Sequence, residues 1–130
     1  MAQGEKAHAK EFDRLIEERK TRPTALMPIW NIAGYTLGVI SVLGGKDSVM
    51  ACTEAVEDVI DKHYSSQINE LETSGKEKEI LKTIRKFHAE EVEHEKIAKN
   101  EISENTPALK AFKKVVELGC KTAINLSEKI

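Results

Sequence analysis

The sequence predicts an all-α protein, a bundle of antiparallel helices, and three observations support this prediction. Charged residues make up 32% of the 130 residues, aromatic residues only 5%, and Gly and Pro are few, which is typical of helical proteins. Apolar residues recur at alternating spacings of three and four, as on one face of a helix. No segment shows the two-residue alternation of a strand. The length corresponds to one domain, which we assign to residues 1–130.

The first predicted helix runs from Met1 to about Glu18. It should end before residues 21–24, because the proline at position 23 disfavours helical geometry in the residue before it. A Glu and a His occupy positions on its apolar stripe, where an unpaired charge would cost several kcal/mol. The stripe consists of Met1, Glu5, His8, Phe12 and Leu15.

Residues 23–45 contain no charged side chain. A membrane-spanning helix needs about 20 predominantly apolar residues, and this segment reaches that length, but its Pro, Gly, Asn, Thr and Ser residues lower its hydrophobicity. We therefore expect a helix that is buried or lies on a membrane surface rather than one that spans the membrane. A crossover helix sealed inside the protein or a dimer is the alternative. Trp30 and Tyr35 suit a boundary between water and lipid.

The third predicted helix opens near Asp47, after a turn at residues 44–48 with a capping residue, and extends to about Thr73. Two registers fit its apolar stripe, and only one of them turns Glu57 inward. The two stripes are Met50, Thr53, Glu57, Ile60, Tyr64, Gln67 and Leu71, and Val49, Cys52, Val56, Ile60 and His63. The orientation of Glu57 is therefore open at this point.

The fourth predicted helix runs from Lys76 to about Ser103, and its stripe again contains a Glu and a His. These two residues are three apart, so their side chains point the same way. After a break at residues 105–107, the last helix extends from about Thr106 to Lys129, and no ionisable group lies on its stripe. The two stripes are Ile80, Ile84, Phe87, Glu91, His94 and Ala98, and Leu109, Phe112, Val116, Gly119, Ala123, Leu126 and Ile130.

Glu5, His8, Glu57, Glu91 and His94 together indicate a metal site. The two Glu-x-x-His motifs are weak evidence alone, because 18 residues are Glu and a charge on a helix usually faces solvent. Their position on apolar stripes is the stronger signal. Carboxylate and imidazole ligands suit iron or manganese. Ferritin-like di-iron bundles place a Glu-x-x-His motif on each of two helices and a Glu on each of two others; this sequence supplies both motifs and one further Glu.

Three other ionisable residues lie near this pattern. Tyr64 follows Glu57 by seven residues and shares its face, where the hydroxyl could hydrogen-bond a ligand carboxylate or a substrate. His63 points about a third of a turn away. His88 lies off the stripe of its helix, and we interpret it as an ordinary, partly exposed histidine.

The cysteines and the net charge narrow the class of function. Cys52 and Cys120 are far apart without a CxxC spacing, so we expect buried free thiols rather than a disulfide. A nucleophilic triad finds no support, because no Ser or Cys lies in a strand–turn–helix context. The net charge of −2 gives no basic surface, and we expect no nucleic-acid partner.

Several short runs spread over the whole chain follow the pattern of a known family. They are Glu5-Lys-Ala-His8, Arg22-Pro-Thr-Ala-Leu-Met-Pro-Ile-Trp-Asn31, Met50-Ala-Cys-Thr53, Ala55-Val-Glu57, His63-Tyr64-Ser-Ser-Gln-Ile68, Glu91-Val-Glu-His94, Gly119-Cys120 and Leu126-Ser-Glu128. They resemble the Coq7 (Clk-1) family of demethoxyubiquinone hydroxylases, and the run from Arg22 to Asn31 is far more specific than either Glu-x-x-His motif.

The resemblance implies a ferritin-like, carboxylate-bridged di-iron monooxygenase of ubiquinone biosynthesis, a 3-demethoxyubiquinol 3-hydroxylase with two Fe ions per subunit. Glu5 and Glu91 would bridge the irons, with His8 on one and Glu57 and His94 on the other. His63 and Tyr64 would lie behind these ligands and relay protons or electrons.

The resemblance also implies where the protein works. Its substrates would be O2 and a polyprenyl benzoquinol held in a membrane. Residues 23–45 would face that membrane and admit the substrate. The protein would then sit peripherally on a bacterial cell membrane, on its cytoplasmic side, or on the mitochondrial inner membrane.

The sequence departs from the family pattern at its beginning. The family has an earlier helix that carries one further Glu ligand, so we expect a bundle that is incomplete at its N-terminus. Three carboxylates leave one positive charge of two divalent irons unbalanced. A missing helix would expose an apolar groove, which favours a homo-oligomer or an assembly with other ubiquinone-biosynthesis proteins. The alternative function is a non-catalytic quinone- or partner-binding helical protein that has lost a complete metal site.

Overall fold

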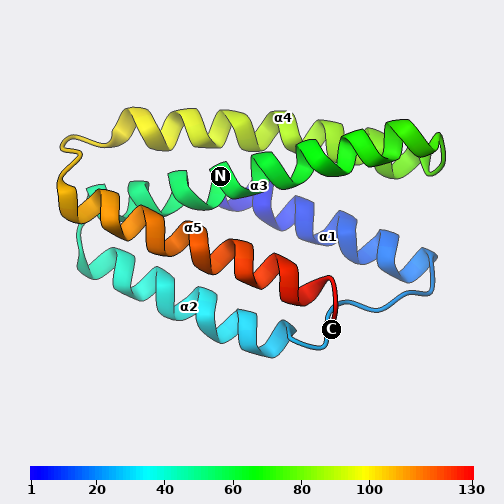
Figure 1. Ribbon diagram of the computed structural model, residues 1–130, viewed down its shortest axis with the longest axis horizontal. Helices are drawn as coiled ribbons and strands as arrows, with labels where there is room; N and C mark the ends of the chain where they lie inside the picture. Colours follow the sequence, from blue (N-terminus) through cyan, green and yellow to red (C-terminus); the bar gives the residue numbers. More distant parts are fainter.

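The computed structural model describes all 130 residues and contains five α-helices and no strand, which confirms the all-α prediction. The helices are α1 (Ala2–Glu18), α2 (Met27–Leu43), α3 (Lys46–Ser74), α4 (Lys78–Glu101) and α5 (Pro107–Ser127). Each helix runs antiparallel to the next, and α3 is the central element, packed against α4, α5 and α2 (Figure 1). The C-terminus lies beside the connection between α1 and α2, where the Ala25 N–H donates to the Ile130 carbonyl over 3.4 Å.

The ends of α3 and α5 follow local sequence signals. Gly75 terminates α3 at φ 65°, a left-handed conformation that glycine adopts without steric cost. The Thr106 hydroxyl accepts a hydrogen bond from the Leu109 N–H, and Pro107 is the first residue of α5. This is the predicted cap followed by proline.

The predicted side-chain cap at the start of α3 is wrong. The helix begins at Lys46 without a side-chain cap, because the Asp47 carboxylate accepts instead from the backbone N–H groups of Ser103 (3.0 Å) and Glu104 (3.1 Å). These two bonds lower the pKa of Asp47. Asp47 therefore ties the connection between α4 and α5 to the start of α3.

Helix α3 is buried on two faces, and neither predicted register describes it alone. One face is a stripe of small side chains that belongs to neither predicted register: Ser48, Ala51, Ala55 and Val59. Glu57 lies about half a turn away from Ala55 and is also buried, with 6% of its surface exposed. A central helix has neighbours on both sides, so its apolar pattern widens and its register becomes ambiguous in the sequence.

The stripes of α1 and α4 pack against each other. The Phe87 ring stacks on His8 at a centroid distance of 4.0 Å and meets the edge of Phe12 at 5.4 Å. On α4 the predicted stripe is buried from Ile84 to Ala98, with only His94 half-buried. On α1 the prediction fails in the first turn: Met1 and Glu5 are exposed, and burial begins at His8.

The predicted stripe of α5 is correct from Leu109 to Val116 and again at Ala123. Beyond Val116 its other members, Gly119, Leu126 and Ile130, are exposed, and the inner face includes Cys120 and Ser127, which were not predicted. Cys120 and Cys52 are free thiols, as expected, although both are half-buried rather than fully buried.

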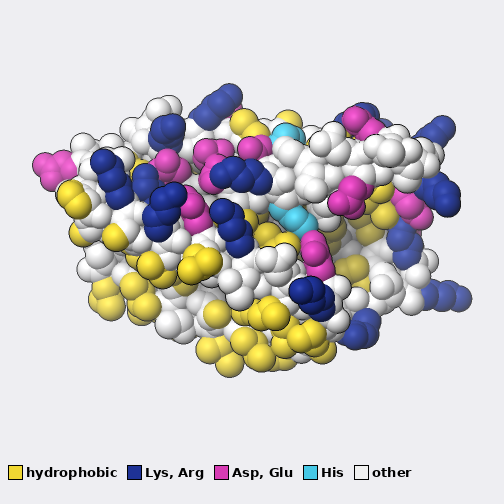
Figure 2. Space-filling model, in the orientation of Figure 1, with side chains coloured by type: hydrophobic (Ala, Val, Ile, Leu, Met, Phe, Trp, Pro, Cys, Tyr) yellow, Lys and Arg dark blue, Asp and Glu magenta, His cyan; other side chains and the backbone are white.

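Helix α2 lies on the outside of the bundle, so the interior position considered for residues 23–45 is wrong for this chain. Only its Ser41 is buried, while Ile32 is 71% exposed, Tyr35 77% and Leu43 82%. Trp30 attaches the helix to α5 by donating from Nε1 to Ser127 Oγ over 2.8 Å. Hydrophobic side chains gather along the edge formed by α2 and α5 (Figure 2). No helix has both the length and the apolar character needed to cross a membrane.

Candidate metal centre

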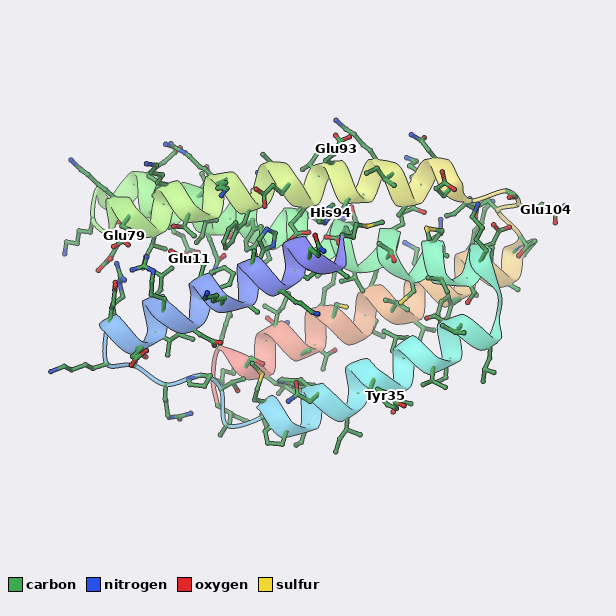
Figure 3. All side chains as sticks on the ribbon, turned by 180° about the vertical axis from the view of Figure 1, so that it is seen from behind. Glu11, Tyr35, Glu79, Glu93, His94 and Glu104 are labelled. Carbon is green, nitrogen blue, oxygen red and sulfur yellow. The ribbon has the colours of Figure 1, made fainter.

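Five side chains from three helices meet in the middle of the bundle. Glu5 and His8 come from the first half of α1, Glu57 from the middle of α3, and Glu91 and His94 from α4. We call them the carboxylate–histidine cluster. In Figure 3 His94 lies beside the first turns of α1. The structure therefore brings together all five residues that the sequence proposes as metal ligands.

Glu91 is the centre of this cluster. Its side chain is 2% exposed, and it presents one oxygen to each histidine: Oε1 lies 2.8 Å from His8 Nδ1, and Oε2 lies 3.1 Å from His94 Nδ1. The contact with His94 has hydrogen-bond geometry, whereas the contact with His8 does not. Glu91 thus separates the two imidazoles and faces both.

Glu5 and Glu57 complete the ring of oxygens. Glu5 Oε1 lies 3.2 Å from His94 Nδ1 and its Oε2 lies 3.8 Å from His8 Nδ1, so it also faces both histidines. Glu57 Oε1 lies 3.8 Å from His94 Nδ1. One ligand atom from each of these two carboxylates, from Glu91 and from His94 lie within 4.8 Å of one another. Glu5 is the only exposed member, with 49% of its side chain accessible.

Three carboxylates so close together repel one another when all are ionised, which favours their protonated forms. Burial, together with the charges of Glu91 and Glu5, raises the pKa of Glu57 to about 9. Burial and the charge of Glu91 also raise the pKa of Glu5, although the two histidines lower it in part. A bound cation would reverse this balance, because it stabilises the ionised carboxylates.

Polar atoms without hydrogen-bond partners also indicate a site for a cation. Two buried side-chain atoms have no hydrogen-bond partner, His8 Nδ1 and Glu57 Oε2, and both belong to the cluster. Buried polar atoms are normally satisfied, so a pair of exceptions in one place calls for an explanation. A carboxylate oxygen and an imidazole nitrogen are both ligands for a divalent metal. The residues present fit a metal centre, and the cluster could hold metal ions.

Tyr64 lies within the electric field of the cluster, whereas His63 makes no contact with it. The Tyr64 ring is half-buried, and burial together with the charges of Glu91, Glu5 and Glu57 raises the pKa of its phenol, so the phenol keeps its proton at neutral pH. His63 lines a groove with residues of α1, α2 and α5, including Phe12, and makes no hydrogen bond or ion pair with the cluster.

The sequence did not predict two contacts made by residues of α4, one by His88 and one by Glu90. His88 is partly exposed, as predicted, but its Nε2 also lies 2.5 Å from Asp61 Oδ1 on α3. Glu90 Oε2 lies 2.5 Å from His8 Nε2. The only sequence signal for Glu90 is its position directly before Glu91, and Glu90 itself lies off the apolar stripe of α4.

Comparison of the sequence with known proteins identifies the family to which the chain belongs. The family model described as "Ubiquinone biosynthesis protein COQ7" matches residues 1–127. The chain belongs to the COQ7 family. This confirms the resemblance seen in the sequence and, with the five helices, the ferritin-like helical class of the fold.

Individual COQ7 relatives match almost the whole chain. A Dictyostelium discoideum protein named NADPH-dependent 3-demethoxyubiquinone 3-hydroxylase, mitochondrial, is 46% identical over 131 residues, which cover 100% of this chain and 60% of the relative. The Homo sapiens protein of the same name is 44% identical over 128 residues, covering 97% and 59%. A Rhodospirillum rubrum 3-demethoxyubiquinol 3-hydroxylase is 37% identical over 126 residues, covering 97% and 58%. The chain thus spans about 60% of the length of these relatives.

Proposed function

We propose that this chain carries the di-iron centre of an O2-dependent monooxygenase that hydroxylates demethoxyubiquinol in ubiquinone biosynthesis. The observation that carries the proposal is the convergence of three carboxylates and two imidazoles around Glu91, with two buried ligand atoms left without partners. Membership of the COQ7 family supports the choice of reaction, because relatives of the chain are named as hydroxylases of this substrate.

The geometry supports a division of the ligands between two irons. Glu5 and Glu91 each present one oxygen to each histidine, which is the arrangement expected of bridging carboxylates. His8 would bind one iron, while His94 and Glu57 would bind the other. When bound, the iron ions supply the redox chemistry that reduces O2.

The surrounding residues shield the His8 part of the site and hold a proton beside it. The Phe87 ring stacks on His8, whose side chain is 6% exposed, and the Phe12 and Phe87 rings meet edge to face. Hydroxylation of one ring carbon with O2 consumes two electrons and two protons, and the second oxygen leaves as water. The Tyr64 phenol stays protonated in the field of the carboxylates, so it can donate a hydrogen bond or a proton toward the cluster. His63 makes no hydrogen bond or ion pair with the cluster, so its proposed part in a proton or electron relay would be indirect.

A groove between α1, α2 and α5 is the proposed entrance for the quinol ring. It has a volume of about 560 Å³ and is lined by ten residues, among them Phe12, Ile16, Met27 and His63. Phe12 lines the groove, and its ring contacts Phe87, which stacks on His8. The exposed apolar face of α2 begins at the same groove. We propose that α2 rests on the membrane surface, so that a polyprenyl quinol enters the groove from the lipid.

A non-catalytic quinone-binding or partner-binding protein is the second candidate function. The observation that favours it is the 49% exposure of Glu5, the one cluster member that solvent reaches freely. Metal at such a position would be held less firmly than at a closed site. The groove and the α2 face would still bind lipid without metal.

Metal content and product formation test the proposal. The protein, expressed from its full native reading frame, is loaded with Fe(II) without oxygen, and bound iron is measured after removal of the excess. We expect about two irons per chain and hydroxylation of a short-chain demethoxyubiquinol when O2 and electrons are supplied. Glu93→Gln, a change at an exposed position of α4, is the matched control and should bind iron normally. Stoichiometric quinol binding with no bound iron would favour the second candidate.

A further inference from the structure

The two Glu-x-x-His motifs pack against each other in a reciprocal way. The residue before the Glu of each motif faces the histidine of the other motif. Glu90, directly before Glu91, contacts His8 of α1. Gly4, directly before Glu5, lies beside His94 of α4, so that a Cβ added there would touch the imidazole. The same position is therefore filled by a carboxylate in one motif and by no side chain in the other.

Glu90 contacts the outer nitrogen of His8. Its Oε2 lies 2.5 Å from His8 Nε2, and the His8 side chain is only 6% exposed. A carboxylate can only accept, so Nε2 must carry the proton of this hydrogen bond. In a neutral imidazole the other nitrogen then has a lone pair. That nitrogen, Nδ1, is buried, unpartnered and directed at Glu91 Oε1.

His94 has no such partner. Its Nδ1 faces Glu5, Glu57 and Glu91, but its Nε2 makes no hydrogen bond or ion pair and lies beside Gly4. A Cβ added to Gly4 would lie 3.6 Å from His94 Cε1 and 3.8 Å from Nε2. Both are ordinary van der Waals distances, so the position has room for a side chain that the sequence does not place there.

We propose that Glu90 is a positioning residue that fixes His8 as the Nε2–H tautomer, directs its Nδ1 lone pair into the cluster, and so makes the two histidine ligands unequal. The proposal rests on the proposed metal-binding function. A carboxylate that accepts a hydrogen bond from a ligand imidazole fixes the ring orientation and raises the basicity of the ligating nitrogen. His8 receives this support, whereas His94 is held only through its contacts with the ligand carboxylates.

The first test uses the metal-free protein and requires no activity. Long-range ¹H–¹⁵N correlation spectra of ¹⁵N-histidine-labelled protein, recorded at about pH 8, distinguish the two neutral tautomers from each other and from the imidazolium. We expect the Nε2–H tautomer for His8. Glu90→Ala should release it toward a mixture, while Glu90→Gln should retain it, because the amide oxygen can still accept the hydrogen bond. An Nδ1–H tautomer of His8 in the unaltered protein would overturn the proposal.

The second test measures metal affinity with Co(II), whose visible absorption reports its ligands. We expect Glu90→Ala to weaken one of the two binding steps by roughly 10- to 100-fold and to change its absorption bands. Glu90→Gln should weaken the same step less, since it keeps the orientation but loses the charge. Glu93→Gln, on the outer side of the same helix (Figure 3), is the control. Equal affinities for Glu90→Ala and Glu93→Gln would refute the positioning role.

The third test fills the position that lacks a side chain. Gly4→Asp places a carboxylate beside His94 Nε2, and Gly4→Ala controls for the gain in helix propensity. We expect Gly4→Asp to tighten the weaker Co(II) step several-fold relative to Gly4→Ala, so that the two affinities approach each other. If Gly4→Asp and Gly4→Ala bind Co(II) equally well, the missing carboxylate beside His94 does not make the two histidines unequal, and that claim is overturned. A chain that binds no metal contradicts the proposed function instead, and the tautomer of His8 still decides the role of Glu90.

Discussion

Helices α4 and α2 reverse the usual relation between polarity and burial. Helix α4 is rich in charge, yet its Glu91 is 2% exposed. Helix α2 has no charged residue, yet Ile32 and Leu43 are 71% and 82% exposed. Burying a carboxylate and exposing large apolar side chains both cost stability. Each helix therefore carries a feature that folding alone does not explain.

The two helices differ in what compensates for these unfavourable features. The buried carboxylates of α4 meet two imidazoles and, by our proposal, metal ions. The apolar face of α2 meets nothing within the chain, since added Cβ atoms at Gly34 and Gly38 would contact no neighbouring atom. A partner outside the chain is needed there, and we propose a membrane surface. The two functions should then be separable by mutation.

The largest expected effect separates metal binding from membrane binding. The double variant Glu91→Ala/His94→Ala removes the central carboxylate and one imidazole, so metal affinity should fall more than about 100-fold. Binding to phosphatidylcholine vesicles should stay unchanged, because α2 is untouched. Isothermal titration with Co(II) and vesicle co-sedimentation measure the two quantities. A parallel loss of vesicle binding would show that the two regions are not independent.

The next largest effect concerns the stability of the metal-free protein as a function of pH. Glu57 titrates at about 9 when folded, against 4.5 for an ordinary Glu, so between these values the folded state binds a proton that the unfolded state lacks. The free energy of unfolding should therefore fall as pH rises through this range, by up to about 1.4 kcal/mol per pH unit.

Glu57→Gln should remove that component of the pH dependence and stabilise the metal-free protein near neutral pH. Urea unfolding in the presence of a chelator, at several pH values, measures it. Glu93→Gln is again the control, because its side chain is exposed. The same slope in both variants would show that Glu57 is ionised in the folded protein and that the cluster tolerates its charge without metal.

A smaller effect is expected from charges placed on α2. Ile32→Glu and Leu43→Glu each remove an exposed apolar side chain that would contact lipid, and each should weaken vesicle binding by roughly tenfold. Thermal unfolding and Co(II) affinity should change little, since both side chains are largely solvent-exposed. Asn69→Glu, at an exposed position of α3, controls for added charge. If all three variants bind vesicles equally, α2 does not face the membrane.

The smallest effect should come from the ion pairs that join α1 to α4. Arg14 contacts Glu79 on α4 at 2.6 Å and pairs with Glu11 and Glu18 on its own helix. These groups are substantially exposed, so Arg14→Met should lower the free energy of unfolding only slightly. Metal affinity should be unaffected, because the stacked His8 and Phe87 rings, not the ion pairs, hold α1 beside the cluster. A large loss of Co(II) affinity would assign that role to Arg14.

The sequence by itself determined the five helices, the breaks at proline and glycine, and the two Glu-x-x-His motifs. These features depend on neighbours within one or two helical turns, which a single sequence displays directly. It also predicted that Glu91 is buried, because the stripe around it is apolar on both sides. The runs that mark the COQ7 family were equally visible, since they are contiguous.

Only the tertiary structure decided which side of α3 faces the cluster, where α2 lies, and which carboxylate meets His8. Glu57 sits on a helix buried on two faces, so its periodicity fits two registers. Residues 23–45 are apolar whether they are covered by protein or by lipid, and composition cannot distinguish the two. Glu90 lies 82 positions from His8, and its contact exists only because α1 and α4 pack side by side, which no local pattern encodes.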